Sequence, residues 1–233
     1  FRSVTFQGDD IRSGRYCTKN YAIHFVREVD DHYYDSVSDV RKEKQIAIWH
    51  KRADQIFALN PDLLNQLPDC ARFLPYAHVD LNDWRPVTVS NLKPLIVHAP
   101  TNRLVKGTQH IEAALDKLRS RGYDFDVEFV EGRTLSEARQ IYSRADIVID
   151  QVLAGWYGGF AVESMALGKP VVAYIRESDL RHIPVEMSQD LPVINATPES
   201  LESVLEDLLS GRVNLIELGK ASRKYVEKWH DPH

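Results

Sequence analysis

The chain has 233 residues, of which 43% are hydrophobic and 27% charged, and its formal net charge is -5. This length and hydrophobic content support one large or two modest globular domains. The negative net charge excludes a global basic field and therefore disfavours nucleic acid as a partner. The sequence has no run of about 18 apolar residues, so it predicts no membrane-spanning helix.

The start of the chain and its cysteines bear on compartment and completeness. Cys17 and Cys70 belong to no CxxC or Cys/His ligand pattern. Two isolated thiols indicate a reducing compartment, so we expect the cytoplasm. The opening residues, FRSVTFQGDD, have no signal-peptide pattern. Because SVTFQG looks like an interior strand with nothing before it, we expect a fragment that lacks upstream strands.

The first lobe is predicted to be an incomplete α/β domain over residues 1–88. Asn60 and Pro61 occupy the cap and first positions that favour a helix start. Small, polar and proline residues in VTVSNLKP, 87–94, suit a linker to the second lobe. The elements expected in chain order are a strand at 3–8, one or two surface helices at 31–52, a strand at 53–59, a helix at 60–67 and a loop at 72–86.

The second lobe, residues 89–233, alternates predicted strands and helices. The strands are expected at 94–100, 124–132, 146–152, 170–175 and 191–196, and the helices at 106–122, 135–145, 159–169 and 198–211. In the first of these helices, Ile111, Ala114, Leu115 and Leu118 recur at helical spacing and predict one buried face. The pattern indicates a doubly wound parallel sheet, in which ligands bind beyond the carboxyl ends of the strands.

Two cations follow the first strand of this lobe. Arg103 and Lys106 stand just before a helix, where the helix dipole disfavours positive charge. An anion bound between them would explain the arrangement, and a solvated pair of surface cations is the alternative. After the second strand, Glu131, Gly132 and Arg133 offer a backbone that a flat ligand could approach, or simply a turn before a helix capped by Thr134 or Ser136.

A glycine-rich loop, GWYGGF, follows the third strand. Gly155, Gly158 and Gly159 remove side chains where the loop becomes a helix, and the free amides of a helix start favour phosphate. Glu163, expected in the first turn of that helix, could complement the dipole or accept two hydrogen bonds from a ribose diol. The sequence contains no P-loop and no GxGxxG motif. Three strand ends together therefore favour a diphosphate held between the lobes.

No metal or histidine chemistry is predicted. The nine histidines show no metal-ligand spacing, and no DxD motif lies at a strand end. His98 ends the first strand of the second lobe and either faces the ligand cleft or caps a turn.

Several of these motifs together resemble the retaining glycosyltransferases of the GT-B fold, in particular the family 4 type with a "group 1" C-terminal domain. The resemblance is carried by NRLVKG, VEG, ADIVIDQ, GWYGGFAVESMALGKPVVAY and ASRKYVEKWHDP. It covers the second lobe from about Pro94 to the end, and it implies that residues 1–88 are the end of an acceptor-side domain. It also implies a Rossmann-like donor domain over 89–233 and a place in polysaccharide biosynthesis. Because such pathways use membrane-associated acceptors, the resemblance extends the expected location from the cytoplasm to the inner face of the membrane.

The resemblance also implies roles for individual residues. Arg103 and Lys106 would be the catalytic cations, which hold the donor diphosphate and stabilise the departing nucleoside diphosphate. No metal or other cofactor is expected, because enzymes of this fold generally need no metal for this step, and the expected substrate is a UDP- or GDP-linked sugar. Glu163 would hold the ribose. The full expected donor-binding set is Glu131, Gly132, Arg133, Gly155, Trp156, Tyr157, Gly158, Gly159, Phe160 and Glu163.

Two positions depart from the family pattern. The family's first glutamate, eight residues before Glu163, is replaced by Gly155, so Trp156 and Tyr157 are expected to shape the sugar pocket. Gln7 stands where many members have a histidine, and glutamine cannot act as a general base. A front-face reaction, in which the leaving phosphate takes the acceptor's proton, tolerates both changes.

The leading hypothesis is a hexosyltransferase that moves a sugar from a nucleotide-diphosphate donor to an unknown saccharide or lipid-linked acceptor with retention of configuration. Gln7, Gly8, Asp9, Asp10 and Arg12 are the candidates for acceptor contacts, and a polar loop with an aspartate cap is an equal alternative. A non-catalytic nucleotide-sugar binding module, a sugar-nucleotide epimerase of the same fold and a scaffold without a ligand remain as other interpretations.

Overall fold

The computed structural model describes residues 1–30, 32–89 and 91–233, so Asp31 in the predicted helical segment and Ser90 in the predicted linker lie outside it. The chain forms two compact units. The first unit comprises residues 1–76 and 176–189, and the second comprises 77–175 and 190–233. The predicted boundary at residue 88 falls inside the second unit, because Trp84 and Val87 hydrogen-bond through their backbones to residues of that unit.

The first unit has a three-stranded parallel sheet in the order β1, β2, β3. The strands are β1 (Ser3–Phe6), β2 (Gln55–Ala58) and β3 (Arg72–Phe73). The helices are α1 (Gly14–Asn20), η1 (Phe25–Arg27), α2 (Ser36–Arg52), η2 (Pro61–Asn65), η3 (Glu177–His182) and α7 (Val185–Asp190). The core consists of Phe6, Ile11, Ile56, Ala58, Leu63 and Leu67.

The predicted strands at 3–8 and 53–59 are confirmed as β1 and β2. The segment 60–67 forms the short 3-10 helix η2, in which Pro61 lies in the first turn and Asn60 makes no side-chain cap. The Asn60 side chain instead accepts a hydrogen bond from the amide of Gly8 at 2.8 Å. This contact ties the turn after β1 to the turn after β2.

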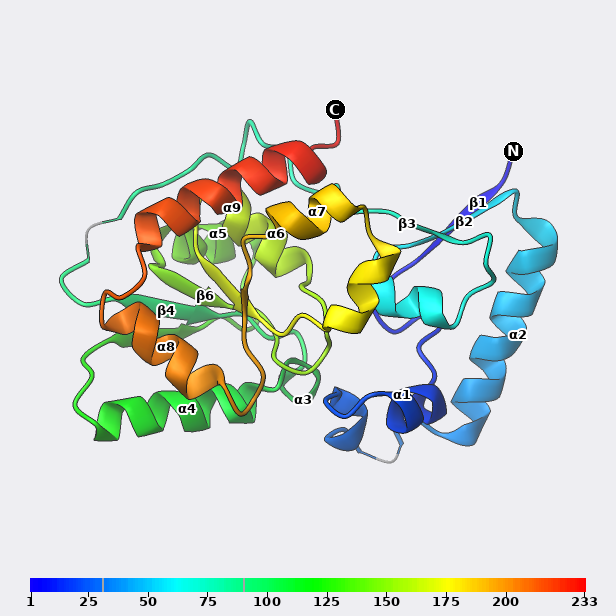
Figure 1. Cartoon of the computed structure of the whole chain (residues 1–233), viewed down its shortest axis with the longest axis horizontal. Helices are drawn as coiled ribbons and strands as arrows, with labels where there is room; N and C mark the ends of the chain where they lie inside the picture. The colour runs from blue at the N-terminus through cyan, green and yellow to red at the C-terminus, as the bar shows by residue number, and fades with distance from the viewer. Residues whose placement is uncertain (31, 90) are drawn as a thin grey trace. The chain divides into compact units, whose positions relative to one another are not determined.

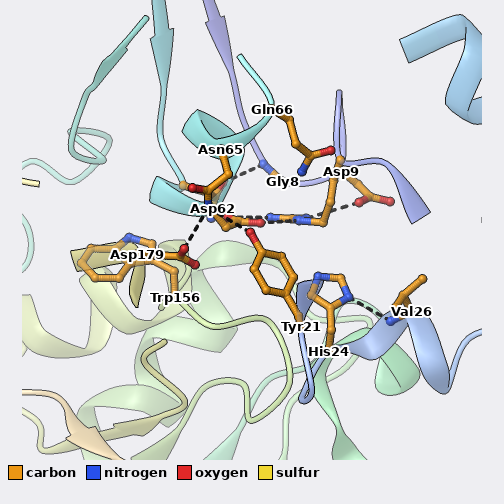
Figure 2. Close-up of polar contacts among 12 residues, drawn as sticks. Gly8, Asp9, Tyr21, His24, Val26, Asp62, Asn65, Gln66, Trp156 and Asp179 are labelled. Carbon is orange, nitrogen blue, oxygen red and sulfur yellow. Dashed lines mark hydrogen bonds and ion pairs between the residues drawn. The ribbon is translucent and has the colours of Figure 1, made fainter. Parts of the chain in front are cut away.

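The segment 176–189 belongs to the first unit through buried polar contacts. Asn65 of η2 donates to Asp179 of η3 at 2.9 Å and to the hydroxyl of Tyr21 at 3.0 Å (Figure 2). Arg176 pairs with Asp179 at 2.9 Å and lies over the ring of Tyr21. A stretch that follows β7 of the second unit along the chain is therefore fixed within the first unit.

The second unit has a five-stranded parallel sheet in the order β5, β4, β6, β7, β8. The strands are β4 (Leu95–His98), β5 (Asp126–Phe129), β6 (Ile147–Ile149), β7 (Val171–Ala173) and β8 (Ile194–Asn195). The chain adds β5 on one side of β4 and all later strands on the other. In an open parallel sheet this reversal creates a topological switch point, here between β4 and β6, where ligands bind.

Helices cover both faces of this sheet, as Figure 1 shows. One face carries α4 (Thr108–Ser120) and α8 (Leu201–Leu209), and the other carries α5 (Leu135–Arg144), α6 (Gly159–Ala166) and α9 (Leu215–Trp229). The predicted doubly wound fold is confirmed, and each predicted strand and helix of the lobe is present with narrower bounds. None of the predicted elements corresponds to α9.

Burial follows the predicted pattern. β6 and β7 are apolar along their whole length and completely buried, as expected for central parallel strands covered on both faces. Ile111, Leu115 and Leu118 form the buried face of α4. Among the described residues, no helix is both long and apolar enough to cross a bilayer.

Candidate functional site

The segments that follow β4 and β6 meet at the switch point. The first contains the short helix α3 (Arg103–Lys106), which ends at Gly107 with φ of 75°. A Cβ at Gly107 would lie 2.6 Å from the side chain of Val152, in the loop after β6, so the two segments touch because this position has no side chain. The amide of Val152 donates to the carbonyl of Lys106 at 3.1 Å. These contacts fix the position of Lys106.

Lys106 forms a buried ion pair at this point. Its Nζ lies 2.6 Å from Oδ1 of Asp150, whose side chain is completely buried at the end of β6. The amide of Gly158 donates to Oδ2 of Asp150, also at 2.6 Å. The carboxylate therefore joins a cation from the β4 side to the start of α6. Asp150 is absent from the predicted site residues, although it ends an apolar strand at the ligand-binding edge.

The start of α6 lies beside Lys106 and the carboxylate of Asp150. Gly158 is its N-cap and provides no capping side chain, so the first amides of the helix point away from any intrahelical partner. A Cβ at Gly158 would lie 3.3 Å from Nζ of Lys106. The lysine and the positive end of the helix dipole therefore converge, and both favour negative charge. The prediction that Lys106, Gly158, Gly159 and Phe160 share one place is consistent with this geometry.

Glu163 lies deeper in α6 than predicted. The helix begins at Gly159, so Glu163 is its fifth residue and the first turn contains no acidic residue. Oε1 of Glu163 is 3.4 Å from Nε2 of His78, and a Cβ at Gly159 would lie 3.2 Å from the same ring nitrogen. His78 belongs to the segment predicted as a loop and is a further residue of this site. Contacts with residues more than 80 positions away along the chain place it there, so no local pattern could have indicated it.

Arg103 and Glu131 are brought together. The guanidinium of Arg103 lies 3.0 Å from Glu131, also pairs with Glu112 of α4, and sits over the ring of Phe129. The hydrogen bond to Glu112 raises the pKa of Arg103. Because its side chain is 43% exposed, these ion pairs can exchange with a bound anion at small cost.

The turn after β5 leaves open space beside its backbone. Gly132 has φ of 64°, and nothing lies within 4 Å of the position that a Cβ would take. Arg133 is exposed, and Thr134 begins α5 with a capping box to Glu137, which confirms the predicted cap. The close approach of a flat ligand here stays a prediction.

The glycine-rich loop is anchored to α9. Tyr157 is completely buried, and its hydroxyl lies 3.0 Å from both the hydroxyl of Tyr225 and Nε2 of His230. The ring of Trp156 packs on that of Tyr157 with centroids 4.3 Å apart, and Gly155 turns the loop with φ of 82°. The hydroxyl of Tyr157 thus holds the loop in place. A role for the two aromatic rings in a sugar pocket stays a prediction.

His98 is a structural residue of the sheet. Its ring is completely buried, with Nδ1 2.7 Å from the carbonyl of Ile149 and Nε2 2.9 Å from the hydroxyl of Thr108. Since a carbonyl can only accept, Nδ1 carries the proton and Nε2 accepts from Thr108. Burial lowers the pKa of His98 to about 4. The ring therefore links β4, β6 and the start of α4.

In the first unit, the predicted acceptor loop is internally bonded. Arg12 is buried, with Nε 2.7 Å from Asp62 and a second guanidinium nitrogen 3.3 Å from Asp9. Asp9 also accepts from the hydroxyl of Tyr34, and Figure 2 shows Asp9, Asp62 and Gly8 around this network. Asp10 accepts from the amide of Gln7 at 3.0 Å, so it closes its own loop instead of capping a helix. Gln7 and Asp10 remain exposed.

A metal site is not formed by the residues that the structure describes. Within 1–30, 32–89 and 91–233, no three His, Cys, Asp or Glu side chains are grouped as metal ligands. The positive charge at the switch point comes from Lys106, Arg103 and the start of α6.

No protein-family model matches the chain, and no curated protein matches its sequence. Solved structures do. Sucrose-phosphate synthase from Thermosynechococcus elongatus aligns with 98% of this chain at 17% identity and a TM-score of 0.61. WaaG, a glycosyltransferase involved in lipopolysaccharide biosynthesis, aligns with 96% at 14% identity and a TM-score of 0.58. TarM of S. aureus, in a complex that includes UDP, aligns with 86% at 16% identity and a TM-score of 0.51.

The chain spans 63%, 70% and 45% of the lengths of these three proteins, respectively. At such low identity the likeness concerns architecture, and it agrees with the parallel sheets and the helices on both faces described above. The chain has the fold of the GT-B glycosyltransferases.

Proposed function

We propose that this chain is part of a glycosyltransferase whose second unit binds the nucleoside diphosphate of a nucleotide sugar. The observation that carries the proposal is the convergence of Lys106 and the start of α6 at the switch point of the sheet. Two sources of positive potential meet there beside the carboxylate of Asp150, and Gly158 and Gly159 add no side chains of their own. A diphosphate is the ligand group that matches both.

In the proposed complex, Lys106 and the amides of Gly159 and Phe160 bind the diphosphate. Arg103 exchanges one of its exposed glutamate partners for a phosphate oxygen. Asp150 does not contact the donor; it holds the ammonium of Lys106 in place and fixes the first turn of α6. These preorganised charges stabilise the negative charge that develops on the leaving group, which makes a metal ion unnecessary.

The proposed reaction keeps the configuration at the anomeric carbon. The bond between that carbon and the diphosphate oxygen breaks, and an acceptor oxygen forms a new bond on the same face. The proton of the acceptor hydroxyl passes to the departing phosphate oxygen. No enzyme base is needed, which fits Gln7 at the position where a base would be expected.

Glu163 is the proposed ligand of the ribose diol. Its side chain is 17% exposed and can accept two hydrogen bonds, while His78 at 3.4 Å orients one of its oxygens. Glu131, Gly132 and Arg133 are proposed to lie beside the base, where the backbone at Gly132 is open.

The choice of donor and acceptor follows the named relatives. The TarM structure contains UDP and alpha-GlcNAc-glycerol, so UDP is the first nucleotide to test, with GDP second. WaaG is involved in lipopolysaccharide biosynthesis. We therefore propose a saccharide or lipid-linked acceptor, a hexose as the transferred sugar, and a cytoplasmic location with peripheral access to the membrane.

The test is calorimetric binding of UDP and GDP in the presence of EDTA. Lys106→Ala should weaken binding about tenfold or more, because it removes a charge-assisted contact to phosphate. Glu163→Ala should weaken it to a smaller extent. Lys117→Ala, which removes an exposed lysine of α4, is the matched control and should bind as the parent does. Failure of the folded parent to bind either nucleotide would contradict the proposal.

A non-catalytic nucleotide-sugar binding module is the second candidate. Gly155 at the position of the family's first glutamate favours it, since this loop then lacks an acid near the sugar. Release of UDP or GDP from the nucleotide sugar, with or without an added acceptor, separates the two candidates. The module binds the donor and releases nothing.

A further inference from the structure

A hollow lies at the opposite end of the same sheet from the proposed donor site, where the strands begin. It has a volume of about 360 Å³ and is bounded by the segment 86–89, the turn 167–170 before β7, and residues 215–224 of α9. Ala145 and Asp146, just before β6, complete it. The amino ends of β6 and β7 therefore form this hollow, whereas the proposed donor site lies at carboxyl ends. Its volume is in the range of small-molecule sites.

Two glycines shape the hollow. A Cβ on Gly219 of α9 would lie 2.2 Å from the carbonyl oxygen of Gly168, so α9 packs backbone to backbone against the turn before β7. Beside this contact the walls are apolar, formed by Pro86, Leu167 and Ile216, among others. Ile216 remains 62% exposed, so the hollow presents apolar surface that no part of the second unit covers.

Lys169 is a buried cation in this hollow. The residue is 2% exposed, and its Nζ donates to the carbonyl of Val87 at 2.8 Å. Among the described residues, no carboxylate lies within 4 Å of that nitrogen. The nearest acid that influences it, Asp146, accepts hydrogen bonds from Asn91 and from the amide of Leu95. Burial lowers the pKa of Lys169 to about 8, and Asp146 opposes the shift.

The rim of the hollow is also positive. Lys220, Arg223 and Lys224 line it, against the single acid Asp146. Lys220 pairs with Glu217, and Arg223 pairs with Glu227 and donates to two carbonyls. Lys224 has no ion pair with any residue that the structure describes. Positive charge therefore remains without a paired carboxylate at Lys169 and at Lys224.

We infer that this hollow binds a small, soluble amphiphile with one anionic head, a carboxylate or a phosphate monoester, and an apolar body. The head would supply the counter-charge that Lys169 lacks, since a buried ammonium is stabilised by a paired anion. The apolar body would cover Pro86, Leu167 and Ile216. A flat bilayer surface fits less well, because its head groups would meet the exposed Lys224 at the rim and would not enter the hollow that Lys169 lines.

The test compares decanoate with decanol, which share the apolar chain and differ in charge, in calorimetric titrations of the full chain. Decanoate should bind about tenfold more tightly. In Lys169→Met this preference should disappear while decanol still binds, which shows that the hollow is intact. Lys224→Met, which changes a rim lysine, is the matched control and should keep the preference. Equal binding of decanoate and decanol to the parent would overturn the inference.

Two further measurements test the role of the Lys169 charge and distinguish a soluble ligand from a membrane surface. The preference for decanoate should fall as the pH rises past about 8, as Lys169 loses its proton beside Asp146, Lys220, Arg223 and Lys224. Cosedimentation with phosphatidylglycerol vesicles that depends on Lys224 but not on Lys169 would assign the surface to membranes and overturn the inference. Binding of UDP is independent of this hollow, so a failure here leaves the proposed donor site untouched.

Discussion

In the second unit's sheet, one buried lysine lies at the carboxyl ends of the strands, here called the carboxyl edge, and another lies at their amino ends, the amino edge. The two lysines differ in their partners. At the carboxyl edge, Lys106 lies 2.6 Å from a completely buried carboxylate, Asp150. At the amino edge, Lys169 has a backbone carbonyl as its hydrogen-bond acceptor. A buried cation with a carboxylate is a fixed structural element, whereas one without it depends more on what binds beside it. At the carboxyl edge Asp150 therefore holds Lys106 in place, whereas at the amino edge Lys169 can pair with a bound anion.

The largest effect on stability is expected from substitution of Asp150 at the carboxyl edge. Asp150→Ala should reduce the free energy of unfolding by about 3 to 5 kcal/mol, because it leaves Lys106 buried and unpaired and frees the amide of Gly158. Asp150→Asn should cost less, since its amide oxygen can still accept from Gly158. Urea unfolding measures both. Asp124→Ala, which breaks the exposed pair with Lys93, is the control and should leave the free energy of unfolding nearly unchanged.

Asp150 should also affect nucleotide binding through Lys106. A double-mutant cycle for UDP affinity with Asp150→Asn and Lys106→Ala tests this. If Asp150 acts by positioning the lysine, its substitution weakens binding in the parent and has no effect once Lys106 is gone. Equal effects in both backgrounds would show that Asp150 contacts the donor directly or acts on the fold alone.

At the amino edge, Lys169 should make the stability of the protein depend on pH in the alkaline range. The folded pKa of Lys169, about 8, is below its usual value of 10.5, so between these values the unfolded chain binds the additional proton. Stability should therefore rise with pH in this window, by about 2 to 3 kcal/mol in total. Lys169→Met should remove this contribution. A parent and variant with parallel stability profiles from pH 8 to 10.5 would contradict it.

A buried histidine beside the carboxyl edge should give a pH dependence of the same sign, with stability rising with pH, but in an acid window. The folded pKa of His98 is about 4 and its ordinary value is 6.5, so the unfolded chain binds more protons between them. Stability should fall by about 2 to 3 kcal/mol as the pH drops from 6.5 to 4. His98→Asn keeps a donor for the carbonyl of Ile149 but does not titrate. Burial lowers the pKa of His24 as well, but its contribution is the same in both proteins, so the difference between them isolates His98.

Local features of the second unit could be predicted from the sequence, whereas contacts between distant residues could not. The alternation of strands and helices, the glycine-rich loop and the cation Lys106 are local patterns, and the structure places them at one edge of one sheet. Asp150 and His78 act through contacts with residues far along the chain, and a single sequence does not show those contacts. α9 is absent from the predicted elements for a different reason. Gly219 interrupts its helical pattern, yet this glycine is what allows α9 to pack on Gly168.

α9 reaches both edges, and Tyr157→Phe tests its link to the carboxyl edge. The substitution removes the hydroxyl that lies 3.0 Å from Tyr225 and from His230, and should cost about 1 kcal/mol of stability. If Tyr157 only anchors the loop, the affinities for UDP and for UDP-glucose should both stay within about twofold of the parent. A selective loss of UDP-glucose binding would instead place the ring at the sugar. In that case the glycine-rich loop recognises the donor through its aromatic residues as well as its backbone, and α9 would set the position of the sugar pocket.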